Sequence, residues 1–175
     1  MKILFLSLLC LISAFLFAQD NNAIKQQLIK DWERAKAYTQ EYLDAMPADK
    51  YDYRPVDSIR SFAEQMLHLA QGNAGLTSNG TGAPQIFVGQ NLERSATAKT
   101  KDSVVHYVNA SYDFAINSLK NMDAAKLSEM VKRGNLNASG TAWIMKAFEH
   151  QTHHRGQCTI YIRLLGIRPP AEKLF

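Results

Sequence analysis

Apolar residues recur every three or four positions in four long segments of this chain, and this pattern limits its fold more than any other feature. The segments span about residues 22–46, 57–72, 101–122 and 138–165. A period near 3.6 residues marks amphipathic helices, and no segment shows the alternation of a half-buried strand. Four long amphipathic helices bury their apolar faces against one another. The sequence therefore predicts an all-α fold, a four-helix bundle.

Helix-breaking and capping residues set the expected boundaries of these helices. Pro47 stops the first helix. Asp57 or Ser58 is a suitable N-cap for the second, which we expect to end near Gly72. Gly166 ends the fourth.

A long connection separates the second and third helices. It runs from Gly72 to Thr100 and carries five of the nine glycines of the chain. Connections of this length in a compact domain are usually functional or mobile. We expect the segment either to close over a site or to be a surface loop. The shorter link from Ala124 to Asn137 is expected to hold a turn of helix.

The first 18 residues read as a secretory signal peptide. Met1 and Lys2 precede an apolar run from Ile3 to Phe17, and Ala18 is a small residue at the exit. The run is shorter than the roughly 20 apolar residues of a membrane helix, and no basic cluster follows it. We expect cleavage after Ala18, export to the periplasm or the medium, and one bundle domain over residues 19–175. No membrane span is expected in the mature chain.

Charge and cysteine content exclude a nucleic-acid-binding protein and a disulfide scaffold. The 20 basic residues barely exceed the 16 acidic ones and are scattered, so we expect no nucleic-acid partner. Of the two cysteines, Cys10 lies in the leader and Cys158 remains alone. A single thiol cannot form an internal disulfide, so packing must hold the fold. We expect Cys158 to be a small core residue.

Two of the five histidines, His150 and His154, lie four residues apart and so share one helix face. Two buried imidazoles need partners, because burying unpaired polar groups is costly. One metal ion can serve both rings, since about 6 Å of helix rise separates them. The alternative is that carbonyls, hydroxyls or water satisfy them. The face is otherwise largely apolar and points into the bundle; its other members are Trp143, Ala147, Cys158, Tyr161 and Leu165.

A metal ion needs at least a third ligand, and His68 is the best candidate. It lies beside the apolar stripe of the second helix. His106 is the next candidate, although an ordinary surface histidine on the third helix fits it better. His153 lies about 100° around the helix from His154 and should face solvent or a partner subunit. Gln151 stands where a zincin carries its catalytic glutamate, so a protease is not expected.

Two further residues are candidate supports for the site. Glu64, one turn before His68, could orient that ring, or it could be a solvated charge. Gly156 costs about 1 kcal/mol relative to alanine inside a helix, which suggests that a backbone or a ligand comes close to it. The alternative for Gly156 is a weak point that the helix tolerates.

Two motifs resemble those of a known family. The run His150-Gln151-Thr152-His153-His154-Arg155-Gly156-Gln157 resembles the His-x-x-x-His-x-Gly-Gln signature of the DinB/YfiT-like superfamily. Residues 62–69, which include His68 after a largely apolar run, resemble its second-helix motif. The link from Met46 to Pro55 looks like the segment that precedes that helix. The resemblance covers nearly the whole chain after the leader.

The resemblance implies a four-helix bundle that often forms homodimers and holds one divalent metal ion (zinc, nickel or iron) through His68, His150 and His154. Some members are thiol-dependent S-transferases or isomerases of the cytosol, whereas this chain is expected to be exported. A three-histidine metal can lower the pKa of a bound water to about 7 or hold a thiolate. The hypothesis is therefore a metal-dependent hydrolase or transferase acting on a small molecule. The alternatives are a non-catalytic metal-binding module and a helical interaction protein without metal.

Overall fold

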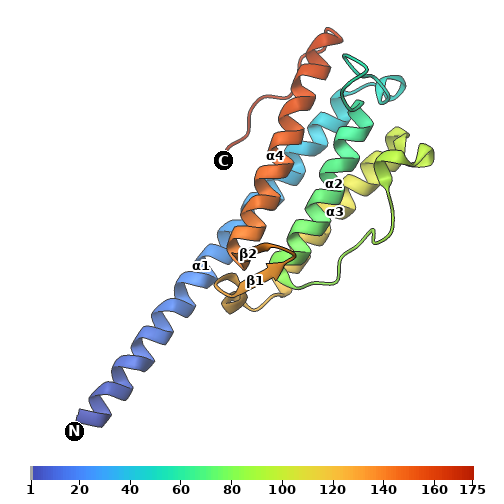
Figure 1. The fold of residues 1–175 in the computed structure, drawn as a ribbon. Coiled ribbons are helices and arrows are strands. Elements are labelled where there is room, and N and C mark those ends of the chain that lie inside the picture. The colour runs from blue at the N-terminus through green and yellow to red at the C-terminus, as the bar shows by residue number, and fades with distance from the viewer. Residues whose placement is uncertain (1) are drawn as a thin grey trace.

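The chain forms a bundle of four long helices in the computed structural model, which describes residues 2–175 and the side chains from Asp20 onward (Figure 1). The predicted all-α bundle is confirmed. The predicted leader, residues 1–18, lies outside the described side chains, so its cleavage stays a prediction. Within the part of the chain that is described, no helix is long and apolar enough to cross a membrane. The four helices are α1 (Lys2–Ala45), α2 (Phe62–Thr81), α3 (Lys101–Asn121) and α4 (Gly140–Leu164).

An apolar core lies between the helices, with α2 packed against both α3 and α4 and α1 packed mainly against α3. Trp32 of α1 is fully buried and meets Tyr112 of α3 and Phe148 of α4 edge to face, with ring centroids 5.7 and 5.6 Å apart. Cys158 is fully buried, which confirms its expected place in the core, and burial raises the pKa of its thiol. Aromatic packing around Trp32 thus joins three of the helices.

Helix α2 begins at Phe62, later than the predicted start near Asp57 or Ser58. Its N-cap is Ser61, whose hydroxyl accepts a hydrogen bond from the backbone of Glu64, while the Glu64 carboxylate accepts one from the backbone of Ser61. This reciprocal capping box satisfies two amides that a helix end otherwise leaves unpaired. Three residues in this stretch are suitable N-caps, but Ser61 is the one followed three positions later by glutamate, and that selects it.

Helix α2 continues to Thr81, so the predicted end near Gly72 is wrong. It ends where Gly82 adopts a left-handed conformation, φ 75°, and donates its N–H to the carbonyl of Ser78. Two of its internal glycines lie where a neighbouring group leaves no room for a side chain. Gly80 lies against the backbone of Gly140 at the start of α4, and Gly72 lies against a side chain of α4.

The remaining connection, residues 82–100, contains two short 3-10 turns, η2 (Leu92–Arg94) and η3 (Ala96–Lys99). It is held against α2. The Gln71 side chain donates to the carbonyl of Gln90 at 2.9 Å and accepts from the backbone of Leu92 at 3.2 Å. Leu92 itself is buried in the core. The connection is therefore anchored beside α2, and we call residues 82–100 the strap.

A small hairpin precedes α4 and was not expected from the sequence. Strand β1 (Met130–Arg133) pairs antiparallel with β2 (Leu136–Ser139). The hairpin follows the 3-10 turn η4 (Ala124–Leu127), and a similar turn, η1 (Ala48–Lys50), lies between α1 and α2. The expected turn of helix in this link is confirmed by η4. The strands have four residues each and are mostly exposed, so they carry no apolar alternation that would mark them. The hairpin lies near the end of the bundle opposite the 46–61 connection (Figure 1).

Candidate metal centre

His68 of α2 and His150 and His154 of α4 meet in the bundle. One nitrogen from each ring can be chosen so that all three lie within 4.8 Å of one another. The ring centroids are 4.4 to 5.0 Å apart. The meeting of these rings agrees with the predicted three-histidine site. It brings together residues 82 positions apart, because α2 and α4 pack side by side.

One pair of ring nitrogens has the spacing of two ligands on one ion. Nε2 of His68 lies 3.2 Å from Nε2 of His150. A tetrahedral ion that binds two nitrogens at about 2.0–2.1 Å holds them about 3.3 Å apart. The two rings therefore need little movement to share a divalent metal.

Glu93 of the strap orients His68. Its Oε1 lies 2.5 Å from Nδ1 of His68, and its Oε2 accepts a hydrogen bond from Nε of Arg60 at 2.6 Å. Burial alone would raise the pKa of Glu93, but Arg60 and His68 outweigh it and hold that pKa below its usual value. The carboxylate can only accept, so Nδ1 of His68 carries the hydrogen. In the neutral form of the ring, the lone pair is then on Nε2, the nitrogen that faces His150.

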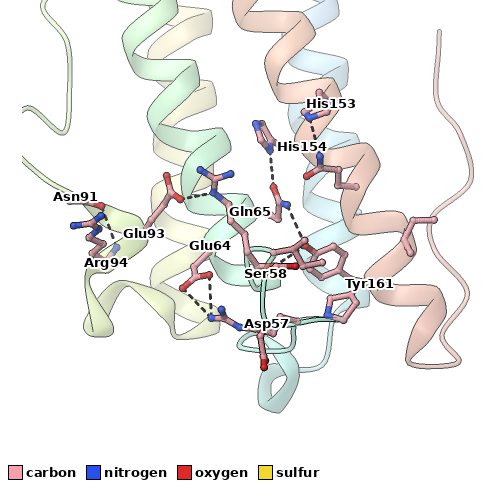
Figure 2. A pocket seen from close by; sticks show the side chains of 16 residues that line it. Asp57, Ser58, Glu64, Gln65, Asn91, Glu93, Arg94, His153, His154 and Tyr161 are labelled. Atoms are coloured by element: carbon pink, nitrogen blue, oxygen red, sulfur yellow. Dashed lines mark hydrogen bonds and ion pairs between the residues drawn. The ribbon is translucent and has the colours of Figure 1, made fainter.

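A chain of hydrogen bonds orients His154 in the same way. The Tyr161 hydroxyl donates to the carbonyl of Arg60 at 2.7 Å and accepts from Nε2 of Gln65 at 3.3 Å. Oε1 of Gln65 is then the acceptor that lies 2.7 Å from Nδ1 of His154. His154 consequently donates from Nδ1 and keeps a lone pair on Nε2. Figure 2 shows Gln65 between His154 and Tyr161, with Glu93 nearby.

The three imidazoles can bind a shared cation more favourably than they can hydrogen-bond to one another. Burial, more than the neighbouring imidazoles, lowers the pKa of His150 to about 4 and that of His154 to about 3, so both are neutral at pH 7. Nε2 of His68 and Nε2 of His154 present lone pairs. The neutral His150 ring has a single N–H hydrogen and cannot donate to both. A divalent ion accepts lone pairs from neutral imidazoles, so the donor set fits a metal.

A cleft of about 970 Å³ opens beside His154. Figure 2 shows its walls, which come from the 54–65 region, the strap and α4. Most of the lining side chains are polar or charged, and they include His153, Gln65, Glu93 and three arginines, Arg54, Arg60 and Arg94. A molecule in this cleft would lie against one of the three candidate ligands.

The other predicted residues are not members of the three-histidine group, although the ring centroid of His153 lies 4.9 Å from that of His154. His106 and His153 are exposed, as expected, and His153 lies 2.9 Å from the amide of Gln157. Glu64 makes no hydrogen bond or ion pair with His68; it caps α2 and accepts a hydrogen bond from Lys99 at 2.6 Å. Gly156 is exposed with no atom within 4 Å of where a Cβ would stand, so the expected close approach of a backbone there is wrong.

Glu93 and Gln65 are the site residues that sequence reasoning missed. Gln65 lies three residues before His68, on a neighbouring part of the same helix face, and this spacing was an available signal. Glu93 lies 25 residues after His68 in a connection without periodicity, so no local pattern points to it.

Comparisons with known proteins agree with the fold. The sequence model of the DinB family matches residues 18–174. A DinB-like protein from Bacillus cereus is 17% identical with a TM-score of 0.72, over 85% of this chain and 97% of that one. A DinB-like protein from Bacillus subtilis is 19% identical with a TM-score of 0.65, over 85% and 96%. A conserved protein from Enterococcus faecalis is 16% identical with a TM-score of 0.65, over 81% and 96%. No curated protein matches.

Proposed function

The chain belongs to the DinB family, and we propose that it is a metal-dependent hydrolase or transferase that acts on a small molecule. His68, His150 and His154 would hold one divalent ion, which we propose to be zinc, nickel or iron. The observation that supports this most is the convergence of three imidazoles, two of which have their tautomers set by Glu93 and Gln65. Outer partners of this kind are typical of histidine ligands in metal sites.

Three histidine ligands leave a coordination position free for water or substrate. A divalent ion held by the three histidines would act as a Lewis acid and would activate a water or a thiol at neutral pH. The low pKa values of His150 and His154 keep these ligands deprotonated, so protons do not compete with the metal at neutral pH.

The cleft beside His154 is the place where we propose that the substrate binds. Its polar lining suits a polar small molecule. Two of its carboxylates are already paired, Glu64 with Lys99 and Arg54, and Glu93 with Arg60. Arg94 is exposed and has no hydrogen-bonding or ion-pair partner for its guanidinium among the described residues. We propose that it offers a cation to an anionic group of the substrate.

Export and assembly belong to the same proposal. The signal-like segment at residues 1–18 supports a periplasmic or secreted protein. Family resemblance supports a homodimer, for which light scattering should return twice the mass of one chain. A monomeric mass would contradict the dimer and leave the metal centre unaffected.

Metal analysis of protein purified without a histidine tag tests the function. We expect about one divalent ion per chain in the native protein, and its loss with metal-dependent turnover in His68→Ala, His150→Ala and His154→Ala. His106→Ala is the matched control, because His106 is exposed and lies away from the centre. A stoichiometry near zero would overturn the metal centre. Metal binding without turnover across a panel of esters, amides and thiol acceptors would favour a non-catalytic metal-binding module.

A further inference from the structure

His150 is the one ligand of the candidate centre without a polar support. His68 is oriented by Glu93 and His154 by Gln65. In contrast, Nδ1 of His150 is buried and has no hydrogen-bond partner among the described residues. The other ring nitrogen, Nε2, lies 3.2 Å from Nε2 of His68, within hydrogen-bond distance. A metal ion bound between these two nitrogens would replace that contact, so another feature must orient the His150 ring in the metal-bound centre.

Gly72 provides the surface on which the His150 ring rests. A Cβ built on Gly72 would lie 2.2 Å from Cε1, 2.4 Å from Nδ1 and 3.0 Å from Nε2 of His150. Real Cβ atoms do not approach heavy atoms this closely, so any side chain at position 72 takes the space of the ring. The imidazole of His150 therefore packs against the backbone of α2 at Gly72.

The position of Gly72 in α2 explains why this contact matters for the centre. Gly72 follows His68 by four residues, so the two lie one turn apart on the face that meets α4. A ring lying over Gly72 reaches along this face to His68, and Nε2 of His150 stands 3.2 Å from Nε2 of His68. A ring lifted off the face would lose this approach.

We propose that Gly72 is a positioning residue of the metal centre, whose missing side chain seats the third histidine ligand against α2. This inference rests on the proposed function for its metal readout, but the contact between glycine and ring exists without metal. An alanine at position 72 cannot move α2, which is packed against both α3 and α4. The His150 ring, at the end of a rotatable side chain, moves instead.

Gly75 offers a matched control three residues along the same helix. A Cβ built there would meet only Nε2 of Gln85, at 3.7 Å, which is ordinary van der Waals contact. Alanine is a better helix former than glycine, so Gly75→Ala should raise the urea midpoint of unfolding. Gly72→Ala gains the same helix propensity, but it also displaces the His150 ring from its packing position.

The first measurement is affinity for zinc or cobalt(II), by chelator competition on the full chain. We expect Gly72→Ala to bind roughly 10- to 100-fold more weakly than the native protein, the range seen when a metal ligand loses its support. Gly75→Ala should stay within about twofold of the native affinity, and the cobalt(II) absorption spectrum should change only in Gly72→Ala. Native affinity in Gly72→Ala would overturn the proposal.

The second measurement is a double-mutant cycle on metal-free protein. Gly72→Ala should leave the urea midpoint unchanged or lower it in the native background. In the His150→Ala background it should raise the midpoint, because the ring that it displaces is gone. Equal shifts in the two backgrounds would overturn the contact. If the native protein bound no metal, the proposed function would fail, while this cycle would still decide whether Gly72 seats His150.

Discussion

Each of the three candidate ligands is held by a different kind of neighbour. His68 has a carboxylate, His154 has the amide end of a hydrogen-bond chain, and His150 has the flat surface of a glycine. Arg60 links the first two, since its guanidinium binds Glu93 and its carbonyl accepts from Tyr161. A change at any of these neighbours should therefore alter metal binding without removing a ligand.

Glu93→Gln should weaken metal binding roughly 10- to 100-fold. The neutral amide no longer pairs with Arg60, and it holds the Nδ1 hydrogen of His68 less strongly than a carboxylate does. Chelator competition measures the affinity. Glu33→Gln is the control, because that carboxylate pairs with Lys120 on the exposed surface. Equal affinity in Glu93→Gln and the native protein would contradict this role.

At the scale of the element, the start of α2 depends on Ser61. Ser61→Ala removes the hydroxyl that accepts from the backbone of Glu64, and such caps contribute about 0.5–2 kcal/mol. Urea unfolding should show a loss in this range. Ser58→Ala, three residues earlier and exposed, should change stability little. Equal losses in the two variants would mean that the cap does not hold the helix end.

Glu64 makes the same helix end sensitive to pH. Burial alone would raise its pKa, but the hydrogen bond from Lys99, the Ser61 amide and Arg54 outweigh it, so the pKa lies below its usual value. A lowered pKa in the folded state stabilises the protein above the unfolded pKa of about 4.3, and this stabilisation is lost as pH falls through the folded value. The free energies of unfolding of the native protein and Glu64→Gln should therefore differ most near pH 7, and the difference should shrink as the pH falls below the unfolded pKa of about 4.3. A difference that is constant with pH would show that the charge is not responsible.

At the scale of the molecule, metal should stabilise the whole bundle, because the centre joins α2 to α4. A free metal concentration 100 times the dissociation constant adds about 2.7 kcal/mol if the unfolded chain does not bind it. This corresponds to a rise in melting temperature of roughly 5–11 °C for a domain of this size. Calorimetry with and without zinc measures the shift. His154→Ala should show little of it, and an equal shift there would place the metal elsewhere.

The mature chain should begin at Gln19. Intact-mass measurement on protein recovered from a bacterial periplasm should show the loss of residues 1–18. Ala18→Trp, which puts a bulky residue at the cleavage position, should retain them. A native chain that keeps its first 18 residues would contradict both the leader and the export proposal.

The sequence alone determined the four helices and the pairing of His150 with His154, because both follow from periodicity within one segment. Only the tertiary structure decided where α2 ends, since glycine weakens a helix and the contacts of Gly72 and Gly80 with α4 are not visible in the local sequence. The same holds for Glu93 and for the role of Gly72, which depend on a strap and a helix that are distant in the chain. Local sequence patterns indicate which secondary structure a segment can form. The support of a metal centre depends on contacts between segments, and these exist only once the helices have packed.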